Sequence, residues 1–233
     1  MIKIEKAIAE LKKVSAECCY PRVLFDFDQQ SEILFPSFRI FEDKLRSQLT
    51  SSSNAQVKNG LSNVLYWGLY RMGIRDVRVK HFRENISDRQ LAQARALFRN
   101  MSGKGLRDIA ELQLPQFSMM PFVSKIRMFL DPKSFVVLDN KLAKLRGRST
   151  FFERLKKTRA DTSIRLTEQN LLFYEDWCGL CVAAARMMGS KNQIAVDAER
   201  AIFELVDRGE IERAAVIVDT VQRALNNKGV GKS

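Results

Sequence analysis

Residues 114–139 read LPQFSMMPFVSKIRMFLDPKSFVVLD, and this stretch decides the fold. Pro121 is placed as a first helical residue, where a proline gives up an amide hydrogen that has no partner within the helix. Apolar side chains then recur at helical spacing as far as Leu130. The pattern stops at Asp131, because the residue before a proline, here Pro132, is disfavoured in a helix. The stretch predicts one buried helix that ends in a sharp turn.

Asp139 follows this turn after the short apolar run of residues 135–138. A helical pattern over residues 140–145 comes next, so the Asp139 carboxylate is placed to accept a hydrogen bond from the first helical turn. Such a cap stabilises a helix by about 1 kcal/mol. We therefore expect Asp139 to mark the beginning of a second helix.

Helical periodicity also dominates the rest of the chain. We expect amphipathic helices near residues 4–14, 38–49, 57–72, 88–98, 106–112, 167–188, 195–206 and 210–225. Residues 22–27 fit a short strand or an irregular loop equally well, and residues 226–233 fit a flexible tail. The chain is therefore predicted to be all-α, with at most a few short strands.

The composition is strongly basic, with 39 Lys and Arg residues against 27 Asp and Glu residues and a formal net charge of +12. This excess favours a polyanionic partner, first a nucleic acid and second an anionic membrane surface. No apolar stretch is long enough to span a bilayer, and the N-terminal sequence does not resemble a signal peptide. We expect a cytoplasmic protein with no membrane-spanning segment.

Positive charge is concentrated in residues 141–159, where Glu153 is the only acidic residue. The basic residues of this segment are Lys141, Lys144, Arg146, Arg148, Arg154, Lys156, Lys157 and Arg159. Charges this close together act jointly on a phosphate backbone and release its counterions. The alternative is a solvated surface with no partner.

The cysteines and the single histidine limit the chemistry. Cys178 and Cys181 have the spacing of half a zinc site, with Cys18 and Cys19 as the remaining candidate ligands, but buried thiols are the simpler interpretation. One histidine, His81, argues against a histidine-ligated metal and against a Ser-His-Asp mechanism. We expect neither a metal nor another cofactor.

Residues 114–139 resemble the core of the helix-hairpin-helix DNA glycosylases, in particular the 8-oxoguanine DNA glycosylase type. That family reads Leu-Pro-Gly-Val-Gly-x-Lys, then a helix, a turn containing Asp, Lys and Pro, an apolar run and the catalytic aspartate. Leu114 and Pro115 match this pattern, and Asp139 falls on the catalytic position. The resemblance extends over about residues 91–203, and only residues 114–145 are specific.

The resemblance implies a single glycosylase-like unit, residues 1–233, built of two helical lobes with a cleft between them. We expect lobes at residues 37–112 and 113–225, with residues 1–36 packing on the second. The iron-sulfur cysteine loop of some relatives is absent from this sequence.

Ser124-Lys125, followed by Phe129-Leu130-x-Pro132 and by Leu138-Asp139, resembles a divergent bacterial branch of this fold. Two residues or groups of residues depart from the family pattern. Gln116 and Ser118 replace the hairpin glycines, which let backbone amides approach a DNA phosphate closely. Met120 holds the position of the lysine that forms a Schiff base with the sugar. Lys125 lies five residues further along the helix, and its direction is rotated from that position by roughly 140°.

The resemblance implies catalysis by Asp139, which would stabilise the positive charge that develops on a sugar as a flipped base departs. Lys125 would act as a nucleophile or as an electrostatic partner, or else it is a structural lysine. We expect DNA contacts from Gln116, Phe117, Ser118, Lys141, Lys144, Arg146 and Arg148. Phe117 is the best candidate for stacking on the extruded base, because it occupies the hairpin tip, whereas Tyr66, Trp67, Tyr70 and Phe122 suit the core better.

The predicted function is therefore a DNA glycosylase-like activity on duplex DNA that carries a damaged or modified base. One alternative is an inactive DNA-binding module of the same fold, for instance in phage defence. Another is a helical scaffold whose basic face binds an acidic protein.

Overall fold

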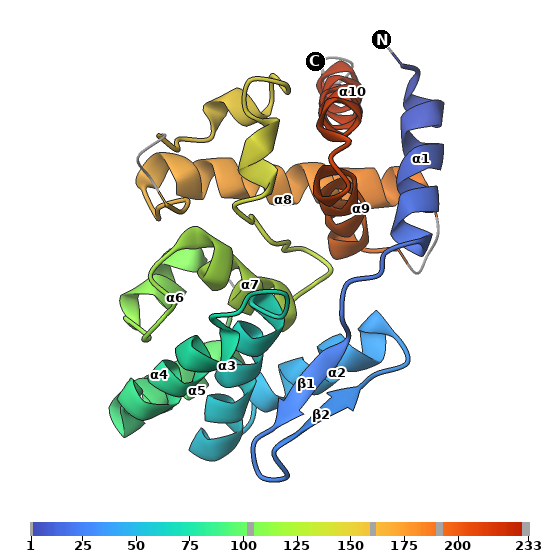
Figure 1. Ribbon diagram of the computed structural model, residues 1–233. Coiled ribbons are helices and arrows are strands. Elements are labelled where there is room, and N and C mark those ends of the chain that lie inside the picture. Colours follow the sequence, from blue (N-terminus) through green and yellow to red (C-terminus); the bar gives the residue numbers. More distant parts are fainter. Residues whose placement is uncertain (1, 102–104, 159–161, 190–192, 230–233) are drawn as a thin grey trace. The chain divides into compact units, whose positions relative to one another are not determined.

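The structure is a computed structural model that describes residues 2–101, 105–158, 162–189 and 193–229 (Figure 1). The chain divides into two compact units. We call Tyr20–Asp131 the middle unit, and Met1–Cys19 together with Pro132–Ser233 the terminal unit. Among the described residues the only sheet is one antiparallel pair of short strands, which confirms the all-α prediction.

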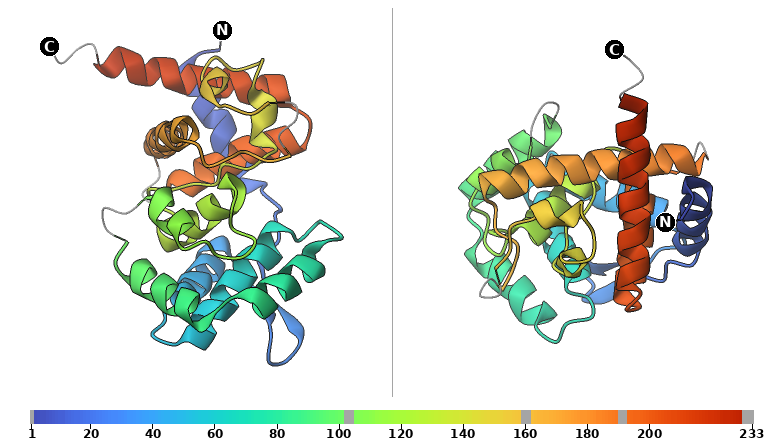
Figure 2. Two further views of the ribbon diagram at one scale, coloured as in Figure 1. Left: turned by 90° about the vertical axis from the view of Figure 1, so that its left-hand side faces the viewer. Right: turned by 90° about the horizontal axis from the view of Figure 1, so that it is seen from above.

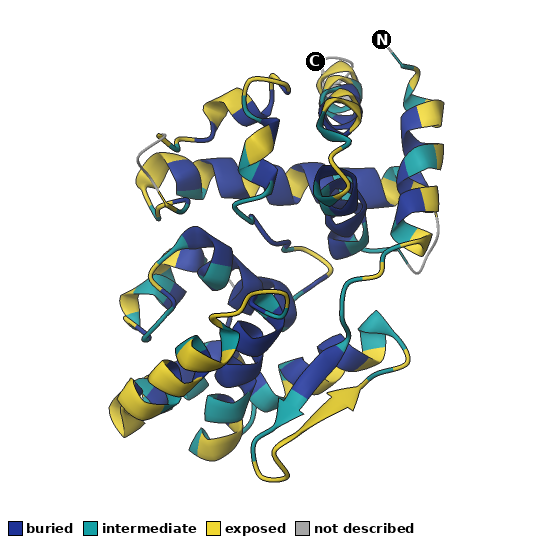
Figure 3. Cartoon of the chain, in the orientation of Figure 1, coloured by how far each residue is buried: buried dark blue, intermediate teal, exposed yellow. Residues whose placement is uncertain are grey.

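The middle unit is built around one central helix. Its elements are β1 (Val23–Asp26), β2 (Ser31–Leu34), α2 (Phe38–Leu49), α3 (Asn54–Gly68), α4 (Arg75–Asn85), α5 (Asp88–Arg99), α6 (Leu106–Glu111) and α7 (Met120–Leu130). The helix α3 packs against α2, α4, α5, α7 and β1, and its residues from Gly60 to Trp67 are all buried. In the hairpin Val23 pairs with Leu34 and Asp26 with Ser31, and β2 is exposed along its whole length (Figure 3).

The terminal unit combines both ends of the chain. Its elements are α1 (Ile4–Ala16), the 3₁₀ turns η1 (Leu142–Leu145) and η2 (Phe152–Arg154), and the helices α8 (Glu168–Met188), α9 (Ala195–Asp207) and α10 (Ile211–Gly229). The four α-helices pack on one another, and α10 runs across α8 (Figure 2). The turn η1 packs on α9 and α10.

Local sequence signals explain where several helices begin and end. Ser87 and Gln90 form the predicted capping box at α5 through two reciprocal side-chain to backbone bonds. Thr167 caps α8, and Gly189 ends it with a φ of +74° that a residue with a side chain rarely adopts. The helix α7 ends before Pro132, as predicted.

The division into units differs from the expected lobes. The boundary falls between Asp131 and Pro132 instead of between residues 112 and 113, because α6 and α7 pack on helices of the middle unit. Residues 20–36 also belong to the middle unit, where β1 contacts α2 and α3. Residues 1–19 fall in the same unit as the C-terminal helices.

Three expected elements have different bounds. The helix predicted over residues 57–72 ends at Gly68, and the expected helix after Asp139 is the short 3₁₀ turn η1. The prediction of a tail beginning at residue 226 is wrong, because α10 continues to Gly229; residues 230–233 lie outside the described residues. The helix α4 was not expected, since only Val79 and Phe82 of its residues are buried and its apolar periodicity is weak. No helix in the described ranges has both the length and the apolar character needed to cross a bilayer.

Candidate nucleic-acid interface

The turn between α6 and α7 keeps the backbone shape of a glycine turn without a glycine. Gln113 has a φ of +49° and Gln116 a φ of +70°, and both values lie in the left-handed region that glycine favours. The Gln116 side chain fixes this turn, because its Oε1 accepts a hydrogen bond from Arg78 Nε at 2.6 Å and its Nε2 lies 2.9 Å from His81 Nδ1. Gln116 is therefore held within the middle unit, and Ser118 beside it is exposed.

Phe117 is not the free aromatic side chain that its place in the turn suggests. It is 3% exposed, and its ring centroid lies 5.7 Å from that of Phe82 and 6.3 Å from that of Phe122. The prediction that the aromatic side chain at the hairpin tip is exposed is wrong, because the Phe117 ring points inward and packs on Phe82 of α4 and Phe122 of α7. Tyr66 and Trp67 are buried, as expected for core residues.

Lys125 is a buried lysine on α7. Its Nζ donates a hydrogen bond to the carbonyl of Pro121 at 3.2 Å and lies 5.3 Å from the centre of the Phe122 ring. Gly68 makes room for its stem, since a Cβ atom at Gly68 would lie only 3.0 Å from Lys125 Cδ. Met120, at the position where the resembled family has its lysine, is fully buried. The amine is thus surrounded by its own helix and by the end of α3.

Asp139 lies half-buried at the beginning of η1. Its Oδ1 accepts a hydrogen bond from the backbone amide of Lys141 at 3.0 Å, and its carbonyl accepts one from Leu142 at 3.1 Å. The predicted helix cap does not form, because η1 begins only at Leu142 and its N-cap residue is Lys141, which has no side-chain cap bond; Asp139 instead binds the backbone amide of Lys141 just before the 3₁₀ turn. The carboxylate is oriented by a backbone amide and is not sealed beneath other side chains.

Two buried side chains of α8 hold the run that leads to Asp139. Tyr174 donates its hydroxyl proton to the Val136 carbonyl at 2.9 Å, and Trp177 Nε1 donates to the Val137 carbonyl at 3.0 Å. The side chains of both acceptor residues are buried, so water cannot replace these bonds. The backbone before Asp139 is therefore fixed on the body of the terminal unit.

Three of the eight basic residues of this segment form ion pairs with carboxylates that are distant in sequence. Lys141 pairs with Asp207 of α9, Arg148 with Glu212 of α10 at 2.9 Å, and Arg154 with Asp176 of α8. Arg146 instead donates to the carbonyl of Lys157. Sequence reasoning counted only Glu153 because it considered the segment alone.

Lys144 and Lys156 are exposed and are the members of this segment best placed to meet a phosphate. Arg159 lies outside the described residues. The expected contact set is thus distributed over both units: Gln116, Phe117, Ser118 and Lys125 lie in the middle unit, and Asp139, Lys141, Lys144, Arg146 and Arg148 in the terminal unit.

Polar side chains fasten this irregular segment to the helices. Asn170 of α8 binds the amide of Lys156 at 2.8 Å and its carbonyl at 2.9 Å. Asp219 of α10 accepts bonds from the Ser149 hydroxyl at 2.6 Å and from the amide of Phe151 at 3.2 Å. Phe151 and its neighbour Phe152 are buried against aromatic rings of α8. Two lysines are therefore presented from a supported backbone.

Among the residues that the structure describes, the cysteines do not gather with other candidate metal ligands. Cys178 and Cys181 are buried, and burial raises the pKa of the Cys181 thiol well above its ordinary value. Cys18 is partly exposed and Cys19 is exposed. Across the described ranges no three His, Cys, Asp or Glu side chains gather in a metal-binding arrangement.

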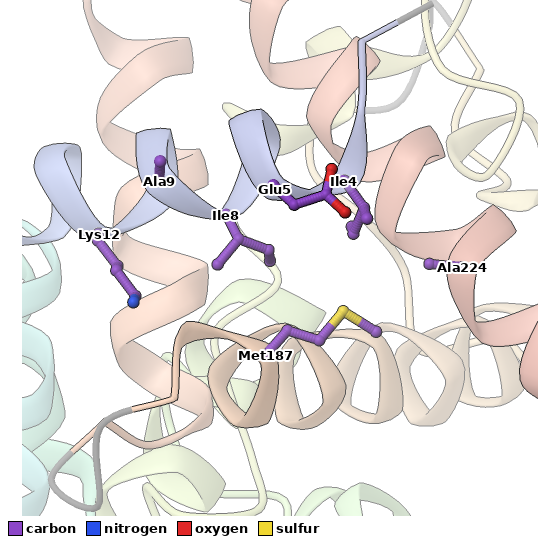
Figure 4. A pocket seen from close by; sticks show the side chains of 7 residues that line it. All are labelled: Ile4, Glu5, Ile8, Ala9, Lys12, Met187 and Ala224. Carbon is purple, nitrogen blue, oxygen red and sulfur yellow. The ribbon is translucent and has the colours of Figure 1, made fainter.

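Two pockets lie away from the expected residues. One, of about 540 Å³, is an apolar groove of the terminal unit, where Ile4 and Ile8 of α1 face Met187 of α8 (Figure 4). The other, of about 600 Å³, lies in the middle unit and is lined by aromatic and charged side chains. Sequence reasoning missed the second because its charged residues lie mainly on α4, whose basic residues around Val79 and Phe82 were the only signal.

Comparisons of the chain with models of known families, with curated proteins and with solved structures found no match.

Proposed function

We propose that this protein binds duplex DNA and cleaves the N-glycosidic bond of a damaged or modified base. The observation that carries the proposal is the placement of Asp139. Its carboxylate is half-buried, oriented by a backbone amide, supported by a buried run and followed directly by a basic segment. A carboxylate that is fixed before the reaction stabilises a developing cation without reorganisation.

The chemistry assigned to Asp139 is electrostatic. As the glycosidic bond breaks, the base leaves with the bonding electron pair and the sugar acquires positive charge, which the carboxylate stabilises until water attacks the sugar carbon. The base must first leave the stack, because its sugar cannot otherwise reach a side chain of the protein. The amide of Lys141 keeps the carboxylate oriented during this step.

Lys125 is assigned a supporting role. A desolvated lysine amine is suited to Schiff-base chemistry, but its bond to Pro121 must open before the amine reaches a sugar. Met120 carries no nucleophile. A hydrolytic, monofunctional reaction is therefore the activity we propose, with cleavage of the bond by water.

DNA binding is assigned first to Lys144 and Lys156, because both are exposed and lie outside the ion pairs of the segment. Ser118 adds an exposed hydroxyl at the turn between α6 and α7. Arg148 and Lys141 contribute once a phosphate competes with their carboxylate partners. Phe117 has no direct contact in this proposal, since it is buried.

An inactive DNA-binding module is the second candidate. Two observations favour it: the Lys125 amine is bound to its own helix, and Met120 stands where the resembled family has its catalytic lysine. Both candidates predict DNA binding, and only the first predicts release of a free base.

Salt-dependent binding to a short DNA duplex tests the shared part. We expect Lys144→Gln and Lys156→Gln each to lower the magnitude of the slope of log K against log salt by about 1, the value for one lost phosphate contact. Lys13→Gln removes the same charge from an exposed position on α1 and is the control. If Lys144→Gln and Lys156→Gln have the same slope of log K against log salt as the control Lys13→Gln, the basic segment does not contact the DNA.

Base release from duplexes with different lesions tests the catalytic part. We expect Asp139→Asn to lose activity while still binding the duplex. Asn also caps helices well, so this variant keeps the local turn and isolates the charge. Borohydride trapping of the parent and of Lys125→Ala tests the proposed hydrolytic route, which predicts no covalent product in either protein.

A further inference from the structure

The pocket in the middle unit is lined by residues of β1 and the turn after it, of α3 and of α4, and α3 packs against both β1 and α4 (Figure 1). Its volume of about 600 Å³ is that of a small-molecule site. Phe25, Phe27 and Tyr66 provide an aromatic wall. The charged lining residues are Lys58, Arg75, Asp76, Lys80, Arg83 and Glu84. Cations therefore outnumber carboxylates around an aromatic surface.

The aromatic wall is fixed in place. The ring centroids of Phe25 and Phe27 lie 5.1 Å apart, and those of Phe25 and Tyr66 lie 5.2 Å apart. Asn63 of α3 binds the Phe25 amide at 2.7 Å and its carbonyl at 3.2 Å. Phe25 and Phe27 are both partly exposed, so an incoming flat ring can reach them.

The hairpin turn beside the pocket is also ordered by its own bonds. Asp26 Oδ1 accepts hydrogen bonds from the amides of Asp28 at 2.9 Å and Gln29 at 3.0 Å. Gln30 Nε2 donates to the carbonyl of Phe27 at 2.6 Å. A wall that is ordered before binding costs less conformational entropy when a ligand arrives.

The cations of the pocket differ in what they contact. Arg75 donates to Asp76 at 2.7 Å and lies 4.1 Å from the centre of the Tyr66 ring, so groups of the protein already balance most of its positive charge. Arg83 donates hydrogen bonds to the neutral acceptors Asn59 at 2.9 Å and Ser62 at 3.1 Å, and its guanidinium lies 4.0 Å above Phe27. The Asp28 carboxylate acts on this guanidinium electrostatically without a hydrogen bond between them among the described residues.

Arg83 and Lys58 are thus the cations available to a ligand. In the part of the chain that the structure describes, neither forms an ion pair, and both side chains are partly buried. Both bonds of Arg83 use the same nitrogen, and a guanidinium has five N–H donors, so donors remain for a phosphate. A partly buried cation whose guanidinium or ammonium forms no ion pair is a good recipient for an anion.

We propose that this pocket binds a nucleotide, with the base against the partly exposed rings of Phe25 and Phe27 and the phosphate on Lys58 and Arg83. Aromatic side chains and guanidinium planes stack on any base, and the lysine and arginine supply the charge that a phosphate requires. The ligand is either a free mononucleotide or an unpaired nucleotide of a single strand. This site is separate from Asp139 and does not depend on glycosidic bond cleavage.

Isothermal titration calorimetry of the whole protein with adenosine 5′-monophosphate tests this site. We expect saturable binding at one site per chain, with adenosine and inorganic phosphate each at least about tenfold weaker, because each lacks one half of the recognition. Lys58→Gln should weaken binding of the monophosphate roughly tenfold. Lys44→Gln, an exposed lysine of α2 outside the pocket, should leave it unchanged.

Phe27→Leu is the second variant and keeps the test independent of the charges. It should weaken the monophosphate and adenosine alike, since stacking contributes to both. A short single-stranded oligonucleotide distinguishes a free mononucleotide from an unpaired nucleotide of a single strand as the ligand. If the oligonucleotide binds more tightly than the monophosphate and Lys58→Gln weakens its binding, the ligand is a single strand. If the oligonucleotide binds more weakly than the monophosphate, the ligand is a free nucleotide.

Absence of saturable monophosphate binding would overturn the proposal. So would equal affinity for inorganic phosphate and the monophosphate, or a monophosphate affinity that Lys58→Gln and Phe27→Leu leave unchanged. Asp139→Asn should bind the monophosphate as the parent does, which separates failure of this site from failure of the proposed glycosylase activity.

Discussion

Replacing Tyr174 with phenylalanine tests whether the run before Asp139 is held by α8. The hydroxyl of Tyr174 is the donor to the Val136 carbonyl at 2.9 Å, and both residues are 2% exposed or less. Removing the donor leaves a buried carbonyl without that bond, which costs about 1–3 kcal/mol. The ring and its packing remain, so no large cavity adds to this cost.

The two tryptophans make the assay specific to one unit, because Trp177 lies in the terminal unit and Trp67 in the middle unit. With Trp67→Phe as the common background, urea unfolding followed by fluorescence reports on Trp177. A loss of about 2 kcal/mol lowers the midpoint by roughly 1 M urea at a slope of about 2 kcal/mol/M. Tyr70→Phe is the control, since its exposed bond to Glu32 at 3.3 Å contributes little. If Tyr174→Phe and the control leave the midpoint equally unchanged, α8 does not hold this run.

Three further predictions concern the turn, the hairpin and the thiols. Gln113→Gly should raise the free energy of unfolding by about 1 kcal/mol, because Gln113 has a φ of +49° that glycine adopts without strain. Gln93→Gly inside α5 should lower the free energy of unfolding by about as much. Thermal unfolding compares the two variants, and a Gln113→Gly protein less stable than the parent would contradict the conformation assigned to the turn. The amides of Gln29 and Asp28 lower the pKa of Asp26 below its ordinary value of 3.8. The Asp26 carboxylate therefore stabilises the hairpin turn fully above pH 3.8, and this stabilisation is lost as the pH falls through the lowered pKa of the folded protein. An NMR titration that gives Asp26 an ordinary or raised pKa would refute this. Cys19 should react rapidly with a thiol reagent, because it is exposed. Cys178 and Cys181 should react only as the terminal unit opens, because both are buried and burial raises the pKa of Cys181. Equally fast reaction of all four thiols would contradict the burial of Cys178 and Cys181.

The sequence predicts helices well wherever apolar residues recur regularly. The helices α5, α7, α8 and α9 begin and end within a residue or two of their expected positions, because capping residues and Pro132 set their ends. The helix α4 was missed because it buries little of its own surface, and α10 extends further than expected because no proline interrupts residues 226–229.

The candidate site was less predictable than the fold. Local sequence predicted that Asp139 caps a helix, whereas in the structure Asp139 binds the amide of Lys141 and the 3₁₀ turn η1 begins only at Leu142. The ion pairs of Lys141 with Asp207 and of Arg148 with Glu212 join residues more than sixty positions apart, which no local pattern reveals. Phe117 lies at a turn in the sequence and yet is buried, because burial depends on the helices that surround the turn.

The central claim is that the carboxylate at Asp139 promotes the loss of a base from DNA. Mass spectrometry of bases released under single-turnover conditions from a set of lesion-containing duplexes measures this directly. We expect the parent protein to release free base from at least one duplex. We expect Asp139→Asn, folded and bound to the same duplex, to release the base at least about a hundredfold more slowly, which is the effect of losing one fixed charge-stabilising group. Equal rates for the two proteins would contradict the central claim.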